Sequence, residues 1–218
     1  MIDIKDKKNI KVLFVIPAYN EEQNIKKVIE DIKNNVNYAD ILVINDNSSD
    51  NTKKIVEQEN IKCINTIINL KYAKAVQTGI KYAYKNDYDY VIQFDADGQH
   101  IATEAEKLLN FMMEKNCDIV IGSRFLEKTD YPHSFFRKVG TKIFYYLIKI
   151  FCKVKITDPT SGFQCLNKKV IKRYANNYPE FPDANLIMEM IYEGYDIQEI
   201  TAKMKIRENG VSMHRGNN

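Results

Sequence analysis

Several signals are missing from this sequence, and each absence excludes a class of protein. No CxxC pair occurs among the four cysteines, which are Cys63, Cys117, Cys152 and Cys165. This spacing argues against a structural zinc site and against the disulfide framework of a small secreted protein. No apolar run approaches the ~20 residues of a membrane-spanning helix, and the first residues lack the apolar core of a signal peptide. We therefore expect a cytoplasmic protein that does not cross a bilayer.

A strong excess of one charge is also missing. The 32 Lys and Arg against 29 Asp and Glu leave a net charge of +3, too weak a bias to predict nucleic acid as the main partner. Basic residues gather in the first eleven positions and between Arg124 and Lys155, where a solvated face is the simplest interpretation. With 44% hydrophobic residues and neither a repeat nor a low-complexity linker, residues 1–218 are expected to form a single domain.

Short apolar runs alternate with helical patterns in the first half of the chain. Apolar, β-branched residues predict strands over residues 11–16, 41–44, 63–67, 90–94 and 118–121. Pro17 is expected to stop the first of these strands, and Asn20 to cap the helix that follows it. Helical spacing predicts further helices over residues 50–58, 73–84 and 104–114. This alternation predicts an α/β fold with a doubly wound, mostly parallel sheet flanked by helices.

The last third of the chain differs in character. Residues 139–152 are apolar and aromatic with interspersed lysines, which suits an interfacial helix at a membrane and a helix of the core equally well. A turn at DPTSGF, a helix over 184–192 and a strand over 197–205 complete the pattern.

Four polar motifs follow predicted strands: PAYNEE, NDNSSD, DADGQH and GSRF. Ligands of such sheets bind beyond the carboxyl ends of the strands, so we expect one site at that edge. Asp95 and Asp97 could together hold a hard cation such as Mg²⁺ or Mn²⁺ while leaving positions for phosphate oxygens. Gly98 relaxes the backbone, and Gln99 offers a further oxygen ligand. His100 could support the ligands from behind or lie at the surface, and the surface position is expected.

The order and spacing of these motifs resemble the family 2 glycosyltransferases, and within them the dolichyl-phosphate mannosyltransferase and polyprenyl-phosphate glycosyltransferase branch. Later segments also match: TDPTSGFQCLNKKVI, FPDANLIMEMIYEGYDIQEI and KIRENGVSMH. The similarity covers essentially the whole chain. It implies a GT-A-type, Rossmann-like fold and an inverting enzyme that transfers a sugar from a GDP- or UDP-linked donor. Residues 11–123 would then be the nucleotide-sugar-binding half, and residues 124–218 the acceptor-side half.

The resemblance also implies roles for residues of the donor site. Pro17, Tyr19 and Glu21 would line the pocket for the base and ribose, and Asp46 would also reach the base. A tyrosine ring supplies a flat apolar wall, and carboxylates accept hydrogen bonds from a base N–H or a ribose hydroxyl.

The metal and diphosphate site would be formed by Asp95, Ala96, Asp97 and Gln99, with Asp97 taking part in catalysis. Arg124 would face the donor or acceptor phosphates, because a planar guanidinium binds phosphate oxygens bidentately.

On the acceptor side, Arg137 would contact the acceptor phosphate, and Arg207 would close over the diphosphate. Asp158 is the first candidate for a catalytic base, with Asp183 and Glu189 as lesser ones. A hydroxyl acceptor would need such a base, whereas a lipid phosphate is already anionic and can attack unaided. In that second case Asp158 would mainly position other groups.

Two stretches depart from the family pattern. Lys71 and Ala73 in NLKYAKAVQTG stand where the family often has glycines, which questions a close backbone approach in that loop. Asn45 precedes Asp46 where the family has paired aspartates.

The acceptor predicted first is a polyprenyl phosphate, with the protein peripheral on the inner face of the cell membrane. A soluble transferase acting on a capsule or envelope glycan is the alternative within the same class. A nucleotidyltransferase and a non-catalytic nucleotide-sugar-binding protein are the alternatives from other classes.

Overall fold

The architecture is described from a computed structural model of the chain. It describes residues 10–126, 135–180, 182 and 184–206, with side chains given from residue 141 onward in the second of these ranges. Within these residues, no helix combines the length and the apolar character needed to cross a bilayer.

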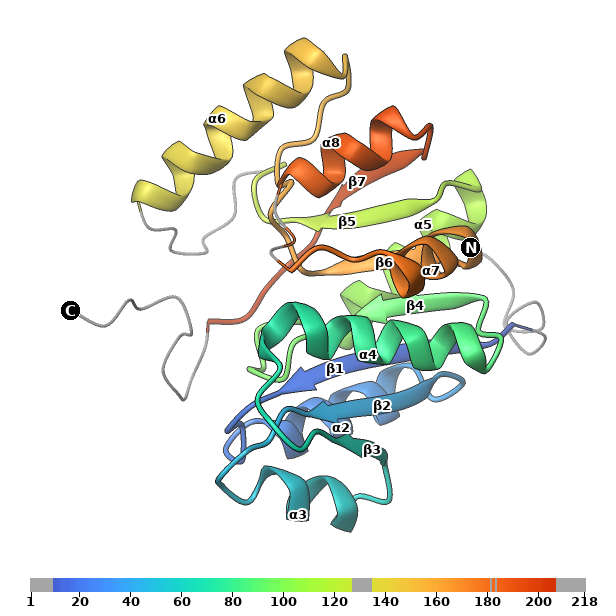
Figure 1. The fold of residues 1–218 in the computed structure, drawn as a ribbon, viewed down its shortest axis with the longest axis vertical. Helices are drawn as coiled ribbons and strands as arrows, with labels where there is room; N and C mark the ends of the chain where they lie inside the picture. Colours follow the sequence, from blue (N-terminus) through green and yellow to red (C-terminus); the bar gives the residue numbers. More distant parts are fainter. Residues whose placement is uncertain (1–9, 127–134, 181, 183, 207–218) are drawn as a thin grey trace.

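One seven-stranded sheet runs through the molecule in the order β3-β2-β1-β4-β6-β5-β7 (Figure 1). Its strands are β1 (Val12–Ala18), β2 (Asp40–Asn45), β3 (Lys62–Asn65), β4 (Tyr90–Gln93), β5 (Ile119–Ser123), β6 (Gln164–Asn167) and β7 (Ile197–Thr201). β6 runs antiparallel to both of its neighbours, and every other neighbouring pair is parallel. The predicted mostly parallel α/β sheet is therefore confirmed.

Helices cover both faces of the sheet. They are α2 (Ile25–Asn35), α3 (Thr52–Gln58), α4 (Lys71–Lys85), α5 (Ala102–Lys115), α6 (Phe135–Phe151), α7 (Lys168–Asn176) and α8 (Ala184–Tyr192). In Figure 1, α4, α7 and α8 lie in front of the sheet, while α2 and α5 lie behind it. Each layer buries its own apolar cluster, such as Ile80 and Tyr174 in front and Ile29 and Leu108 behind. The strands are buried on both sides, which explains their nearly continuous apolar runs.

β1 does not stop at Pro17, so that prediction was wrong. The strand continues to Ala18, and Pro17 lies in register with Ile44 of β2. The carbonyl of Val15 accepts from Phe94 on the β4 side, so Pro17, two residues further, faces the same side. β4 has already ended at that level, at Gln93. The N–H that proline lacks would therefore have no strand partner, and proline is tolerated.

Asn20 does not cap a helix, which also differs from the prediction. α2 begins at Ile25, and Asn20 has a left-handed backbone with φ of 54°. Its side-chain oxygen instead accepts a hydrogen bond from the backbone N–H of Ser49. The backbone N–H of Glu21 likewise donates to the hydroxyl of Thr52. The polar loop after β1 is thus connected by hydrogen bonds to the loop that follows β2.

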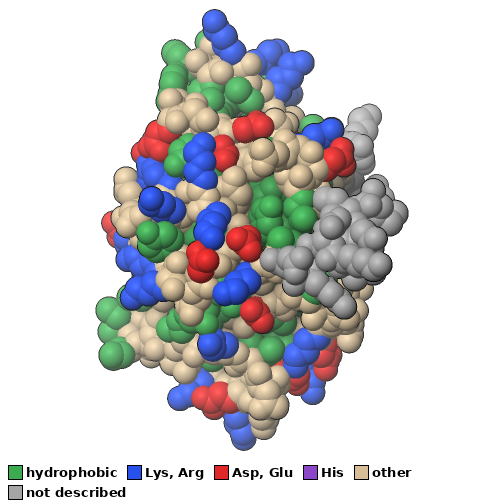
Figure 2. All heavy atoms as spheres, turned by 90° about the vertical axis from the view of Figure 1, so that its right-hand side faces the viewer, with side chains coloured by type: hydrophobic (Ala, Val, Ile, Leu, Met, Phe, Trp, Pro, Cys, Tyr) green, Lys and Arg blue, Asp and Glu red, His purple; other side chains and the backbone are tan. Residues whose placement is uncertain are grey.

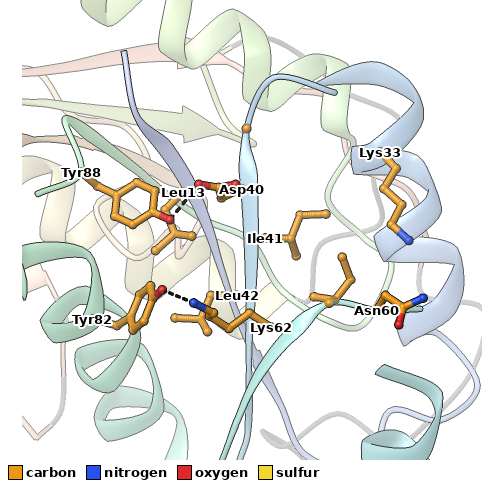
Figure 3. A pocket seen from close by; sticks show the side chains of 11 residues that line it. Leu13, Lys33, Asp40, Ile41, Leu42, Asn60, Lys62, Tyr82 and Tyr88 are labelled. Atoms are coloured by element: carbon orange, nitrogen blue, oxygen red, sulfur yellow. Dashed lines mark hydrogen bonds between the residues drawn. The ribbon is translucent and has the colours of Figure 1, made fainter. Parts of the chain in front are cut away.

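The edge at the amino ends of the strands carries a pocket of about 320 Å³ between β1, β2 and β3 (Figure 3). Its polar groups already pair with one another: Tyr88 donates to Asp40, and Lys62 donates to Tyr82. Basic and acidic side chains are mixed over the surface on this side of the molecule (Figure 2). Among the described residues that line this pocket, the paired polar groups do not indicate a charged ligand, and the polar motifs lie at the opposite edge.

Candidate active site

The loops after β1, β2, β4 and β5 meet at the carboxyl edge of the sheet, as the motif positions predict. Hydrogen bonds connect the first two loops tightly. Glu22 donates from its backbone to Asp50, and its carboxylate accepts from both nitrogens of Asn51. Such reciprocal bonds hold two loops in one conformation without a regular element.

The predicted base-pocket residues lie in and beside these loops. Asp46 is buried, and its Oδ1 accepts from the Leu70 backbone N–H at 2.8 Å and from the Thr66 hydroxyl at 3.0 Å. It thereby fixes the loop between β3 and α4. Tyr19 keeps 41% of its surface exposed, which leaves ring surface for a flat ligand. Glu21 accepts from the side-chain amide of Asn24 at 2.7 Å.

Asp95 is held by one neighbour from α4 and one from its own loop. Its Oδ1 accepts from the hydroxyl of Tyr72 in α4 at 3.0 Å, and its backbone N–H donates to Nδ1 of His100 at 2.9 Å. Nε2 of His100 lies 3.7 Å from Oδ2 of the same carboxylate. The side chain of Asp95 is therefore approached on both oxygens.

His100 is buried, so its predicted surface position was wrong. Its ring stacks on Phe163, with centroids 4.4 Å apart, and meets the edge of Phe94. Burial lowers the pKa of His100 to about 4, with Arg124 adding to the fall and Asp97 opposing it. The imidazole is neutral near pH 7, and because Nδ1 accepts a hydrogen bond, the proton resides on Nε2.

Asp97 lies at the tight turn after β4. Its Oδ1 accepts from the backbone N–H of Gln99 at 3.0 Å, and Gly98 has φ of +79°, a conformation that other residues rarely adopt. Ala96 between the two aspartates is buried. Within the described residues, no group of three or more His, Cys, Asp and Glu side chains could hold a metal ion. A cation here would need ligands beyond the two carboxylates, such as the Gln99 amide oxygen and phosphate oxygens.

Arg124, just after β5, and Asp158, in the loop before β6, form a bidentate ion pair. Nε of Arg124 lies 2.7 Å from Oδ2 of Asp158, and a terminal nitrogen lies 2.8 Å from Oδ1. Asp158 is fully buried, whereas Arg124 keeps 15% of its side chain exposed. Both oxygens of Asp158 are therefore already engaged as hydrogen-bond acceptors of the guanidinium. The pairing favours positioning, the second of the two roles considered for Asp158.

Glu199 of β7 anchors the same loop, and the sequence did not point to it. Its carboxylate accepts from the backbone N–H and hydroxyl of Thr157 and from the backbone N–H of Asp158, at 2.6–2.9 Å. Burial raises the pKa of Glu199, while these hydrogen bonds oppose the shift. A glutamate in a short strand carries no local signal of such a role, because its partners are about 40 residues away.

The remaining predicted residues are less defined. Arg137 lies in α6, where only its backbone is described, and Arg207 and Asp183 fall outside the described residues. Glu189 pairs with Arg173 of α7 at 2.6 Å, in an ion pair on the front helices.

Comparisons with known proteins identify the family of the chain. The sequence profile described as "Glycosyl transferase family 2" matches residues 13–175. The chain is 29% identical over 179 residues to the UDP-N-acetylglucosamine–dolichyl-phosphate N-acetylglucosaminyltransferase of Methanococcus voltae, covering 74% of this chain and 71% of that protein. It is also 29% identical to the dolichol-phosphate mannosyltransferase of Pyrococcus furiosus, over 95% of this chain but 60% of the relative.

A solved structure extends the comparison to the fold. Glucosyl-3-phosphoglycerate synthase from Mycobacterium tuberculosis, in complex with Mn²⁺, UDP and glucosyl-3-phosphoglycerate, superimposes with a TM-score of 0.70 at 14% identity. The match covers 95% of this chain and 75% of that one. Because the family profile spans well over half of the sequence, the protein belongs to glycosyl transferase family 2 and has a GT-A-type fold.

Proposed function

We propose that the protein transfers a sugar from a GDP- or UDP-linked donor to a polyprenyl phosphate at a membrane surface, in a reaction that depends on Mg²⁺ or Mn²⁺. The observation that carries this proposal is the meeting of Asp95, Asp97 and Arg124 at the carboxyl edge of the sheet. His100 connects these positions: its Nε2 lies 3.7 Å from Oδ2 of Asp95, and its ring stacks on Phe163, whose carbonyl accepts a hydrogen bond from Gly122, two residues before Arg124. Carboxylates and a guanidinium at one edge of the sheet suit a ligand that brings both a cation and phosphates.

The donor half of this site would use the loops after β1 and β2. The ring of Tyr19 offers a wall for the base, while Glu21 and Asp46 provide carboxylates near the ribose and base. Pro17 extends β1 up to this pocket.

The metal would lie between the carboxylates of Asp95 and Asp97, with Gln99 as a further oxygen donor. Two carboxylates suit a hard cation and leave positions for diphosphate oxygens. When bound, such a cation neutralises the charge that develops on the leaving diphosphate. Arg124, held by Asp158, adds a fixed positive charge beside it. The structure described for the mycobacterial synthase contains Mn²⁺ together with UDP, which supports this assignment.

The acceptor proposal is supported by the names of the relatives, two of which transfer sugars to dolichyl phosphate. A lipid phosphate carries its own negative charge, so it can displace the nucleotide directly without a general base. Direct displacement inverts the anomeric carbon. The fully buried, paired Asp158 fits this mechanism as a residue that positions Arg124.

Calorimetric titration tests the donor proposal. We expect one of GDP-mannose, UDP-glucose and UDP-N-acetylglucosamine to bind in a Mn²⁺-dependent manner, and to release the nucleoside diphosphate when polyprenyl phosphate is added. Release of pyrophosphate from a nucleoside triphosphate, when a sugar 1-phosphate is supplied in place of these donors, would instead indicate a nucleotidyltransferase. Donor binding without transfer to any acceptor would indicate a binding protein, and transfer only to a soluble glycan would replace the lipid acceptor.

α6 provides a surface for the proposed membrane contact. Thr141 and Ile148 are buried on one side of the helix, and Ile148 joins the front apolar cluster. The opposite side carries an exposed apolar stripe, spaced by three and four residues: Ile143, Tyr146, Leu147, Ile150 and Phe151. Lys142 and Lys149 are exposed and flank it. One buried side and one exposed apolar side flanked by lysines support the proposal that α6 is an interfacial helix beside anionic lipid.

We expect the double variant Ile143→Gln/Ile150→Gln to bind vesicles of anionic lipid at least about tenfold more weakly than the wild type, because less apolar surface enters the bilayer. Vesicle flotation with polyprenyl phosphate in the membrane measures this. Ile67→Gln/Ile68→Gln is the matched control, since both isoleucines are exposed in the loop before α4. Equal binding by wild type and the α6 variant would remove α6 from the membrane contact.

A further inference from the structure

The start of α4 has a left-handed residue at a position where the family often has glycine. Lys71 has φ of +71°, a left-handed conformation that costs a non-glycine residue free energy. Ala73 is buried, so a methyl group is accommodated at that position. Lys71 thus adopts a conformation typical of glycine, and Ala73 fits at the second position where the family often has glycine.

This backbone shape directs the next residue, Tyr72, toward the site. Its hydroxyl donates to Oδ1 of Asp95 at 3.0 Å. It also lies against Gly162 of the loop before β6, where an added Cβ would come within 2.7 Å of the hydroxyl oxygen and 3.9 Å of Oδ2 of Asp95. The Tyr72 hydroxyl is thus the point where α4, the DADGQH turn and the DPTSGF loop come together.

The two carboxylate oxygens of Asp95 have different neighbours at different distances. Tyr72 donates a hydrogen bond to Oδ1, whereas His100 approaches Oδ2 only to 3.7 Å. The hydrogen bond that His100 accepts at Nδ1 comes from the backbone N–H of Asp95 and does not involve the carboxylate. Tyr72 therefore makes the shorter of these two contacts and fixes the rotation of the carboxylate.

We propose that Tyr72 is a positioning residue for Asp95, which orients the carboxylate toward the cation that accompanies the donor. This inference rests on the proposed function, because it assigns Tyr72 a role in the same metal site. Groups that hydrogen-bond a metal ligand orient it, and their removal typically weakens metal binding by about 10- to 100-fold.

The test is Tyr72→Phe, with Mn²⁺ affinity measured by electron paramagnetic resonance in the presence of UDP or GDP, whichever the wild type binds. We expect the variant to bind Mn²⁺ about 10- to 100-fold more weakly. Its circular dichroism spectrum should match that of the wild type, because only one oxygen atom is removed. Tyr82→Phe is the matched control: it removes a tyrosine hydroxyl from the same helix, where that oxygen accepts from Lys62. Its Mn²⁺ affinity should be unchanged.

A second comparison uses Gly162→Ala in the wild type and in Tyr72→Phe. The new methyl group should displace the hydroxyl and weaken Mn²⁺ binding in the wild-type background. It should have a smaller effect in Tyr72→Phe, where the oxygen at 2.7 Å is gone and the ring carbon lies 3.7 Å away.

The outcomes separate the two proposals. If wild type binds no nucleotide in a Mn²⁺-dependent manner, the proposed function fails. If wild type binds but Tyr72→Phe retains Mn²⁺ affinity within about twofold, only the role of Tyr72 is overturned. An equal effect of Gly162→Ala in both backgrounds would also overturn it.

Discussion

Replacement of Asp97 by alanine is expected to lower sugar transfer by at least about 10²-fold and to abolish the Mn²⁺ dependence of donor binding. With Asp97 gone, Asp95 would be left as the only carboxylate in the DADGQH turn. A single carboxylate holds a divalent cation weakly, so the charge on the leaving diphosphate would no longer be neutralised. Calorimetry of the donor, with and without Mn²⁺, measures the first loss, and nucleoside diphosphate release measures the second.

Asp87→Ala is the matched control for this experiment. Asp87 lies in the turn before β4, at the opposite end of that strand, and pairs with the exposed Lys168 at 2.7 Å. Its replacement should leave donor binding and transfer unchanged. Undiminished Mn²⁺-dependent binding by Asp97→Ala would remove the metal from the DADGQH turn.

Replacement of Arg124 by methionine is expected to destabilise the fold by about 3–5 kcal/mol and to suppress transfer. Methionine retains much of the packing but leaves the carboxylate of the fully buried Asp158 without its counter-ion. An uncompensated buried charge is costly, because the interior solvates it poorly. Urea unfolding followed by circular dichroism gives the free energy of unfolding.

Two further variants distinguish a buried charge from simple loss of packing. Arg124→Met/Asp158→Asn should regain part of the lost stability, since no charge remains to be buried. It should not regain activity, because the guanidinium is still missing. Arg173→Met should cost only about 1 kcal/mol, because its glutamate partners remain largely solvated. A double variant no more stable than Arg124→Met would contradict the buried-charge explanation.

The regular elements that could be predicted are those with strong local patterns. β1, β2, β4 and β5 are apolar runs, and their helices show clear helical spacing. β6 was missed because its four residues, QCLN, begin and end with polar side chains. Its burial comes from two neighbouring strands that are distant in sequence.

α7 was not predicted, although the sequence contains the signal of a helix start. Asn167 caps it by accepting from the backbone N–H of Val170, and buried residues recur at helical spacing through Tyr174. Asparagine followed by this spacing is a recognisable helix start.

The candidate site could be predicted as far as it depends on residues within one motif. The DADGQH turn and the ligand edge followed from the sequence. The roles of Tyr72, His100 and Glu199 did not, because each depends on partners from other elements. Asp158 was singled out, but its pairing with Arg124 joins positions 34 residues apart and became visible only in the fold.

The antiparallel position of β6 has a consequence for the nascent chain. During synthesis, β4 and β5 emerge long before residues 164–167, the strand that pairs with both. The ribosome adds ~5–20 residues per second. The edges of β4 and β5 that later pair with β6 therefore stay unpaired for seconds after β5 has been synthesised. Unpaired edges invite pairing with other chains. The interval before β6 arrives is therefore the stage at which the growing polypeptide depends most on chaperone protection.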